Sequence, residues 1–352
     1  MQAETHLLPG DTPGSAYSLR VLRFRGSDPS APRAYLQAAL HGEEVPGTAA
    51  LHGLAPKLAA AEAAGRLRGD VTILPYANPI GLSQELFGAP MGRFGFATRT
   101  NFNRDFPLLD AGDTASLVAL DAAATRVEKR LKAHLLRLSH GHDIVLDLHC
   151  DDEGLPYLYI HNKLWPGMRD LATALGARAV LIWEGSSDAA FEEAAFHPHA
   201  ALAANDPALD RLAVSTVEFR GIADVAPDTA AQDADGLLAF LTMRGVVDGP
   251  LPARPDFDGP VTPLDHVEML RTPVGGAILY AVTPGTSVRA GDLIATILTA
   301  PGEPGGTVEI RAPQDGLILT RRTRRVAQAG DDLAKLLGSR PSSTARGGAL
   351  EA

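Results

Sequence analysis

Cysteine is almost absent from this chain of 352 residues, because Cys150 is the single one. No internal disulfide can form, so the sequence is compatible with a reducing cytosol and predicts a cytoplasmic protein. The first residues, MQAETHLLPG, have neither a basic start nor an apolar core, so we expect no signal peptide. Runs approaching the ~20 apolar residues of a membrane span are also missing, and a membrane is not an expected partner.

The chain also has fewer basic than acidic residues. Lysine and arginine total 32 against 42 aspartate and glutamate residues, and the net charge is -10. Nucleic acids and acidic membrane surfaces attract basic proteins, so the sequence argues against both as partners. Hydrophobic residues make up 45%, enough for a sizeable core, and the length suits one large domain with a small second one.

The first two thirds of the chain alternate short apolar runs with Ala- and Leu-rich helical stretches. Predicted strands cover 17–24, 34–40, 71–76, 143–148, 157–160, 179–183 and 212–219; predicted helices cover 47–65, 113–139, 168–176 and 229–245. This alternation is typical of an α/β fold. We therefore expect residues 1–245 to form a mixed, mostly parallel sheet flanked by helices.

The composition changes after residue 245. Residues 246–260 are rich in Pro, Gly and Asp and are predicted to be a linker. Residues 261–338 contain short strands with frequent turn signals, which predicts a small all-β, barrel-like domain. A helical period returns only at 331–337, and residues 339–352 are expected to be a disordered tail.

Ionisable residues follow the ends of three predicted strands. His41 comes directly after Leu40, His149 follows the strand 143–148, and Glu218 lies near the end of 212–219. Ligands of open α/β sheets bind at the carboxyl ends of strands, so these side chains could meet at one site. Glu44 lies three residues after His41 and can reach the same point.

Two imidazoles and one carboxylate are a hydrolytic zinc set, with the fourth position left to water. Zinc lowers the pKa of such a water and polarises a carbonyl. A separate carboxylate must then accept the water's proton and pass it to the leaving nitrogen, and Glu218 is the candidate.

Each of these residues also has a simpler interpretation. A histidine at a strand end is usually a hydrogen-bonding surface residue, and Glu43 and Glu44 could be solvated carboxylates that favour a helix start. Glu218 could be a structural partner of Arg220. The joint pattern nevertheless favours a metal site, because such a combination rarely arises by chance.

A Gly- and aromatic-rich loop at 92–107 concentrates positive charge and amides. It contains Arg93, Arg99, Asn101, Asn103 and Arg104. The loop is either a basic surface segment or a fork that binds a substrate carboxylate and polarises a carbonyl.

Four motifs, HGEE, NFNRDFP, DLHC and TVEFRG, together resemble the succinylglutamate desuccinylase/aspartoacylase family of the zinc carboxypeptidase clan, over about residues 15–330. The resemblance implies one Zn²⁺ per chain held by His41, Glu44 and His149, with Glu218 as general acid/base. It also implies that Asn103 and Arg104 hold the substrate carboxylate. A further arginine should stabilise the oxyanion, with Arg93 as first choice and Arg99 as second.

The C-terminal segment resembles a biotinyl/lipoyl-like β-barrel. Carrier domains of that type modify a lysine at a hairpin tip, but the corresponding stretch TAPGEPGGTVEI has no lysine. We therefore expect either a structural module or one that narrows access to the site, rather than a swinging arm.

The sequence thus predicts a zinc-dependent amidohydrolase that acts on a small N-acyl amino acid or N-acylated amine. A metallocarboxypeptidase with a wider cleft and a non-catalytic binding protein are the alternatives. The acyl group is left open, and a homo-oligomer is compatible with the sequence. Glu184, Asp188, Glu192 and Glu193 form an acid-rich loop that either is simply solvated or attracts an amine-bearing substrate.

Overall fold

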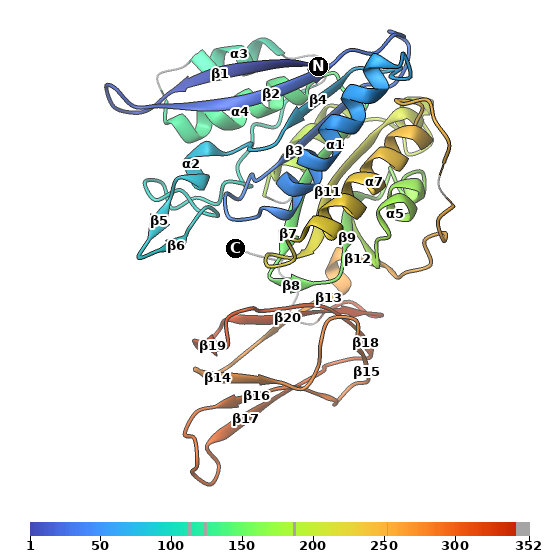
Figure 1. Ribbon diagram of the computed structural model, residues 1–352. Coiled ribbons are helices and arrows are strands. Elements are labelled where there is room, and N and C mark those ends of the chain that lie inside the picture. The colour runs from blue at the N-terminus through green and yellow to red at the C-terminus, as the bar shows by residue number, and fades with distance from the viewer. Residues whose placement is uncertain (111–113, 123–124, 186–187, 252, 343–352) are drawn as a thin grey trace.

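The computed structural model describes residues 1–110, 114–122, 125–185, 188–251 and 253–342. Its centre is a nine-stranded sheet (Figure 1). In spatial order the strands are β1 (Gln2–Pro9), β2 (Ala16–Phe24), β4 (Val71–Leu74), β3 (Ala34–Ala38), β7 (Ile144–Asp151), β11 (Ala213–Gly221), β9 (Tyr157–His161), β10 (Ala179–Trp183) and β12 (Val261–Pro263).

The sheet is mixed and mostly parallel, as expected. Strands β4, β3, β7 and β11 run parallel to one another, as do β9, β10 and β12. The antiparallel contacts are β1 with β2, β2 with β4, and β11 with β9. The middle strands are buried on both faces, which explains why β3, β4 and β7 are continuous apolar runs in the sequence.

Helices cover both faces of this sheet (Figure 1). One layer contains α1 (Pro46–Ala63), α5 (Arg169–Leu175) and α7 (Pro227–Met243), which pack on one another. The opposite layer contains α3 (Thr114–Ala122), α4 (Val127–Ser139) and α6 (Phe191–Phe196). A four-residue helix, α2 (Pro79–Leu82), precedes a short hairpin of β5 (Glu85–Leu86) and β6 (Ala89–Pro90). The helices of the described segments are not long and apolar enough to cross a membrane.

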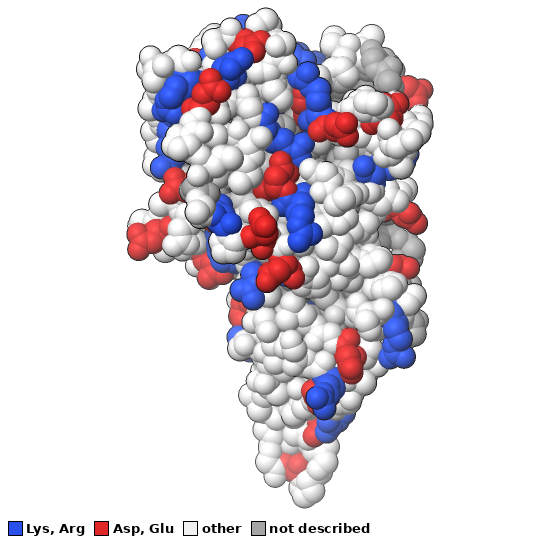
Figure 2. All heavy atoms as spheres, turned by 90° about the vertical axis from the view of Figure 1, so that its right-hand side faces the viewer, with Lys and Arg blue, Asp and Glu red and all other residues white. Residues whose placement is uncertain are grey.

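The C-terminal region is all-β and consists of two sheets below the large one (Figure 1). One sheet contains β13 (Val267–Arg271), β20 (Asp332–Gly338), β18 (Gly316–Arg321) and β15 (Ser287–Val288). The other contains β17 (Thr307–Arg311), β16 (Leu293–Leu298), β14 (Gly276–Tyr280) and β19 (Val326–Ala327). The region tapers away from the broad α/β part, and positive and negative charges are interspersed on the face seen in Figure 2.

Two strand pairings among the described residues link the chain's C-terminal segment to its α/β part. The short strand β8 (Glu153–Gly154), which follows β7, pairs with β18 of the C-terminal region. β12, at the start of the segment expected to be the β domain, pairs with β10 and completes the large sheet instead. The β region is therefore connected directly to the end of β7, where His149 lies.

The sequence prediction is wrong in several places, and three of them share one physical cause. The helical period at 331–337 is in fact strand β20, which lies between β13 and β18 and is buried along most of its length. The helix expected over 113–139 is two helices; α4 begins anew where the Asp11 carboxylate accepts a hydrogen bond from the Val127 backbone N–H. Strand β1 has no predicted counterpart. In all three places, the local structure depends on a strand partner or a helix-capping residue that is distant in the sequence.

The expected tail begins with described residues. The backbone N–H groups of Ser339 and Arg340 both donate to the Gln314 side-chain oxygen. The rest of the expected disordered tail, residues 343–352, lies outside the described residues, as does residue 252 of the expected linker.

Candidate active site

His41 and Glu44 lie on a tight turn after β3. Ala39 has a φ of 57°, a left-handed conformation that costs energy for a residue with a Cβ and ends the strand abruptly. The Gly42 N–H donates to the Gly92 carbonyl, and a Cβ on Gly42 would lie 2.3 Å from the backbone nitrogen of Leu82. A Cβ on Gly92 would likewise lie 2.5 Å from Cα of Gly42, so only glycine at this position lets the loop that carries Arg93 pack against the turn.

His149 and Glu218 are brought together by strand pairing. They are direct partners in the parallel register of β7 and β11, so both side chains lie on the same face of the sheet. The same register pairs Ala38 of β3 with Leu148, which places the turn after β3 beside His149. The predicted convergence of three strand ends is therefore present.

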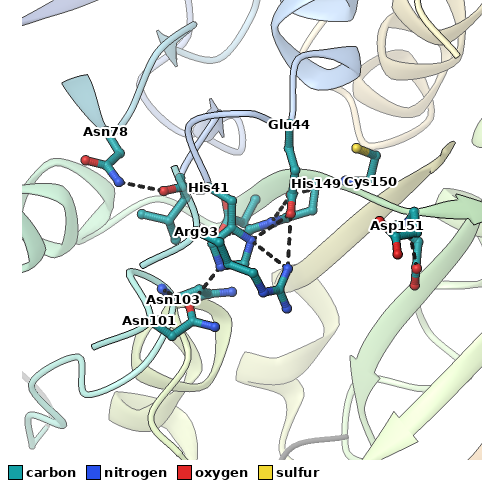
Figure 3. A network of polar contacts seen from close by, with 12 residues as sticks. His41, Glu44, Asn78, Arg93, Asn101, Asn103, His149, Cys150 and Asp151 are labelled. Atoms are coloured by element: carbon teal, nitrogen blue, oxygen red, sulfur yellow. Dashed lines mark hydrogen bonds and ion pairs between the residues drawn. The ribbon is translucent and has the colours of Figure 1, made fainter. Parts of the chain in front are cut away.

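His41, Glu44 and His149 form a buried cluster (Figure 3). The Glu44 carboxylate lies between the two rings, 2.8 Å from Nδ1 of His41 and 2.7 Å from Nδ1 of His149. The ring centroids are 4.9 Å apart, and one potential ligand atom from each residue lies within 4.8 Å of the others. With only 5% of its surface exposed, Glu44 is not a solvated helix-start carboxylate.

The other nitrogen of each ring contacts a hydrogen-bond acceptor. Nε2 of His149 lies 2.9 Å from an Asp147 carboxylate oxygen, and Nε2 of His41 lies 2.8 Å from the side-chain oxygen of Asn101. Both Nε2 atoms must therefore be protonated, which leaves the Nδ1 lone pairs directed at the Glu44 carboxylate. A positive charge shared by these atoms, either a proton on an imidazole or a bound cation, satisfies the carboxylate and both rings.

The pKa values of Glu44 and His149 show how strongly the charged groups of the cluster act on one another. Burial by itself would raise the pKa of Glu44, but the two histidines hold it well below its usual value. Burial would likewise lower the pKa of His149, but Asp147 and Glu44 raise it well above the usual value. The site thus favours a positive charge next to a charged carboxylate.

Asp147 is a positioning residue that sequence reasoning missed. Its side chain is fully buried, contacts His149 through one oxygen and accepts a hydrogen bond from Gln37 Nε2 at 3.0 Å through the other. Tyr35 in turn donates to Gln37 at 2.7 Å. The i, i+2 spacing of Asp147 and His149 on one strand face was the available signal.

We expect Asp147→Asn to weaken zinc affinity about 10- to 100-fold, as is usual for partners of metal-binding histidines. An asparagine has one acceptor oxygen, so either His149 or Gln37 would face an N–H group. Competition with a chromogenic chelator measures the affinity. Asp235→Asn, which changes an exposed carboxylate on α7, is the matched control; equal affinities in the two variants would contradict this role.

Glu218 lies in the same cleft, and its Oε2 is buried without a hydrogen-bond partner among the described residues. Burial raises the pKa of Glu218 to about 8. The alternative pairing with Arg220 is wrong, because Arg220 forms an ion pair with Asp233 of α7. A carboxylate oxygen that has no hydrogen-bond partner in the described part of the chain, and that lies beside a metal-type cluster, is suited to proton transfer.

The structure separates the two candidate arginines. Nη1 of Arg93 lies 3.3 Å from Glu44 and 3.4 Å from Nδ1 of His41, and Figure 3 shows its side chain directed at the cluster. Arg99 is exposed and lines a neighbouring hollow with Phe94 and Phe96, not the cleft that holds the cluster. Of the two arginines, Arg93 is therefore the one that lies beside the cluster.

Asn103 and Arg104 both line the cleft. The Asn103 side-chain oxygen accepts a hydrogen bond from the Phe191 backbone N–H at 2.8 Å, which ties this loop to the start of α6. Arg104 Nη1 donates to the Asn103 carbonyl at 2.7 Å, and its Nε lies 3.6 Å from Asp188. Asn101, which the sequence grouped with them, instead contacts His41.

The cleft has a volume of about 700 Å³, and both regions of the chain form its walls. The C-terminal region contributes Arg271, Arg322, Arg324 and Lys335. Lys335 Nζ lies 2.5 Å from Asp151 and 3.0 Å from the Tyr157 hydroxyl. Sequence reasoning missed Lys335, because the segment that carries it has a helical pattern.

Cys150 is buried, and burial raises the pKa of its thiol far above the usual range. Its sulfur points away from His149 in Figure 3, as expected for neighbouring residues of a strand. It is not placed as a nucleophile.

Known proteins resemble this chain in sequence and in fold. Residues 30–244 match the model of the succinylglutamate desuccinylase/aspartoacylase catalytic domain. The chain belongs to this family.

Two relatives cover most of the chain. It is 28% identical over 314 residues to the N-alpha-acetyl-L-2,4-diaminobutyric acid deacetylase of Halomonas elongata, a match that covers 86% of this chain and 81% of the deacetylase. The structure of a succinylglutamate desuccinylase/aspartoacylase family protein from Shewanella amazonensis superimposes with a TM-score of 0.83 at 26% identity, covering 96% of this chain and 99% of that one.

A third comparison extends to a ligand-bound structure. The product-bound ectoine utilization protein EutE (DoeB) of Ruegeria pomeroyi has a TM-score of 0.68 at 21% identity, covering 95% of this chain and 94% of that one. Its fold therefore matches across both regions. Both of these structures therefore share the fold of this chain across the α/β part and the β region.

Proposed function

We propose that the chain is a zinc-dependent amidohydrolase that removes a short acyl group from a small N-acyl amino acid or N-acylated amine. The observation that carries this proposal is the cluster of His41, Glu44 and His149, with Glu218 in the same cleft and its Oε2 without a hydrogen-bond partner among the described residues. The deacetylase activity named for the Halomonas relative supports the same reaction type.

The three ligand residues fit zinc in number and type. Two imidazole nitrogens and one carboxylate, each buried and held by a neighbour, are a common catalytic zinc set that leaves a coordination position open. Zinc bound there would supply Lewis acidity toward the scissile carbonyl and make a water molecule more acidic.

The chain's own residues supply proton transfer and positioning. Glu218 accepts a proton from the attacking water and returns it to the amide nitrogen as the carbon–nitrogen bond breaks, because an amide anion is too basic to leave. Arg93 lies beside the cluster and donates hydrogen bonds to the oxyanion that develops on the carbonyl. Arg104 binds the carboxylate of the amino-acid part, and Asn103 holds Arg104 and α6 in place.

The shape of the cleft favours small substrates over peptides. Its volume is in the usual range for small-molecule sites, and the β region and the α6 segment both contribute walls. This supports an amidohydrolase rather than a carboxypeptidase. The single cysteine is in keeping with a cytoplasmic location.

A combined metal and substrate assay tests the proposal. Purified protein should contain about one zinc per chain and should hydrolyse one or more members of a panel of N-acetyl, N-succinyl and N-aspartyl amino acids. Cleavage of peptides in preference to these compounds would favour the carboxypeptidase alternative. Absence of zinc after metal-replete purification would favour the binding-protein alternative.

A further inference from the structure

A second hollow, which we call the side hollow, lies next to the catalytic cleft. Its volume is about 350 Å³, and it is lined by Glu43, Met91, Arg93, Phe94, Gly95, Phe96 and Arg99. Four of these residues, Glu43, Met91, Arg93 and Phe94, also line the cleft, so the two spaces adjoin. Among the residues given a role in hydrolysis, only Arg93 borders the side hollow.

Apolar side chains of the side hollow are exposed to solvent. Phe94 is 40% exposed and Phe96 is 50% exposed, and Met91 is partly exposed as well. Exposed apolar side chains that line a concave site mark a place where an apolar group binds, because both surfaces then leave water. The side hollow therefore suits a hydrocarbon group.

The charged side chains of the side hollow have other surroundings. Nη1 of Arg93 lies 3.3 Å from Glu44 in the metal-type cluster. The Glu43 carboxylate lies against the turn, where a Cβ on Gly92 would be 2.5 Å from its Oε2. Arg99 could attract an anionic group, but its side chain is exposed, and an ion pair in water contributes little.

The loop that forms the side hollow is held in shape by Gln84. Its Nε2 donates to the carbonyls of Met91 at 2.7 Å and Phe94 at 2.6 Å, and its Oε1 accepts a hydrogen bond from the backbone N–H of Phe96 at 2.9 Å. The Met91 N–H also donates to the Gln84 carbonyl at 3.0 Å. A fixed backbone thus presents the aromatic rings, so a ligand binds without having to order this loop.

The position of Arg93 indicates which part of a substrate reaches the side hollow. In the proposed function the scissile carbonyl lies between the cluster and Arg93, and its carbon carries the amine on one side and the acyl chain on the other. Arg104, which binds the carboxylate of the amino-acid part, does not line the side hollow. The acyl chain is therefore the part that extends past Arg93 into it.

We propose that Met91, Phe94 and Phe96 form an acyl-chain subsite, which takes an apolar acyl group longer than acetyl. The inference rests on the proposed amidohydrolase function and deepens it, because it names the acyl group that the sequence left open. The chain of such a group packs on the two aromatic rings. An acyl group that ends in a carboxylate, such as succinyl, is disfavoured, because its charge would lose water against these rings.

A series of acyl groups on one amino acid tests the subsite. N-acetyl-, N-butanoyl- and N-hexanoylalanine differ only in chain length, and each methylene that leaves water strengthens binding about three- to fourfold. Because the rings stay partly exposed, we expect kcat/KM of the zinc-loaded wild type to rise roughly 10- to 100-fold from acetyl to hexanoyl. N-succinylalanine, which matches butanoyl in length, should be hydrolysed more slowly than N-butanoylalanine. A preference for succinyl would overturn the subsite.

Phe96→Ala removes one wall of the subsite. It should reduce kcat/KM for N-hexanoylalanine roughly 10-fold and leave N-acetylalanine nearly unchanged. Phe87→Ala is the matched control, because Phe87 is fully exposed in the turn between β5 and β6 and does not line the side hollow. It should keep the wild-type dependence on chain length. Equal effects of Phe96→Ala on all chain lengths would overturn the subsite while leaving the hydrolase proposal intact.

Binding of alkyl hydroxamates decides the subsite independently of turnover. A hydroxamate binds zinc through its two oxygens and carries an alkyl chain in the place of the acyl chain. Hexanohydroxamate should bind zinc-loaded wild-type and Phe87→Ala protein more tightly than acetohydroxamate does, and Phe96→Ala should remove most of the difference. If this selectivity is present but no N-acyl amino acid is hydrolysed, the amidohydrolase proposal fails and the acyl-chain subsite stands. Equal binding of both hydroxamates to the wild type would overturn the subsite.

The competing occupant is a second copy of the chain, because Leu86 and Phe87 are exposed on the neighbouring hairpin. Sedimentation of wild-type and Phe96→Ala protein distinguishes the two. An acyl-chain subsite predicts the same oligomeric state for both. Dissociation of a wild-type dimer by Phe96→Ala, with no effect of chain length on hydrolysis or hydroxamate binding, would make the side hollow a subunit interface and overturn the subsite.

Discussion

Glu218→Gln is expected to abolish nearly all amide hydrolysis while zinc remains bound at about one per chain. Proton transfer by a positioned side chain contributes about 10²- to 10⁴-fold to catalysis, and glutamine can neither accept nor return the proton. The shape of the side chain is conserved, and Glu218 is not one of the three clustered residues, so the metal site should stay intact. Steady-state rates together with metal analysis measure both outcomes.

The pH profile gives a second readout for Glu218. Burial raises its pKa to about 8, and a general base works only when ionised, so activity should fall as pH falls through the group's pKa. A cation bound nearby stabilises the carboxylate and moves this fall to lower pH. Any residual activity of Glu218→Gln should not show this fall in activity at low pH. Glu184→Gln, which changes a carboxylate that does not line the cleft, serves as control, and unchanged turnover in Glu218→Gln would remove this residue from the mechanism.

His149→Ala is expected to lower the zinc content from about one per chain to near zero and to abolish activity. The variant leaves His41 and Glu44 as ligands, and it leaves Asp147 buried without the imidazole that it contacts. A ligand that binds only the folded state stabilises it by about 4 kcal/mol at a thousand times its Kd, so the variant should also lose the metal's contribution to stability.

Thermal unfolding with and without a chelator separates metal loss from misfolding. The chelator should lower the melting temperature of the wild type but leave that of His149→Ala unchanged. His52→Ala, which changes an exposed histidine on α1, should behave like the wild type. Retention of a full zinc complement by His149→Ala would show that the metal, if bound, is held elsewhere.

Local sequence pattern was sufficient for much of the fold. Most predicted strands agree with the observed ones, because β3, β4 and β7 are short apolar runs buried on both faces. Segment 331–337 shows the limit of this reasoning. A short apolar run with one lysine fits both the helical period of 3.6 residues and the strand period of two. Only pairing on both sides, with β13 and β18, makes this segment a strand.

Residue types and their order along the chain determined the chemistry of the candidate site. The spacing of His41 and Glu44, and the positions of His149 and Glu218 at strand ends, follow from the sequence, since a strand end and a three-residue turn are local features. The tertiary structure decided which groups meet. The register of β7 with β11 places Glu218 beside His149, and the loop after Gly92 brings Arg93, not Arg99, to the cluster.

The remaining features depend on contacts across long stretches of chain. Asp147 contacts His149, Lys335 reaches the cleft from the β region, and α6 packs on β7 and β11. A sequence specifies which groups carry charge or lone pairs, but the distances between them are set only when the strands pair and the helices pack. Coordination and proton transfer both depend on those distances.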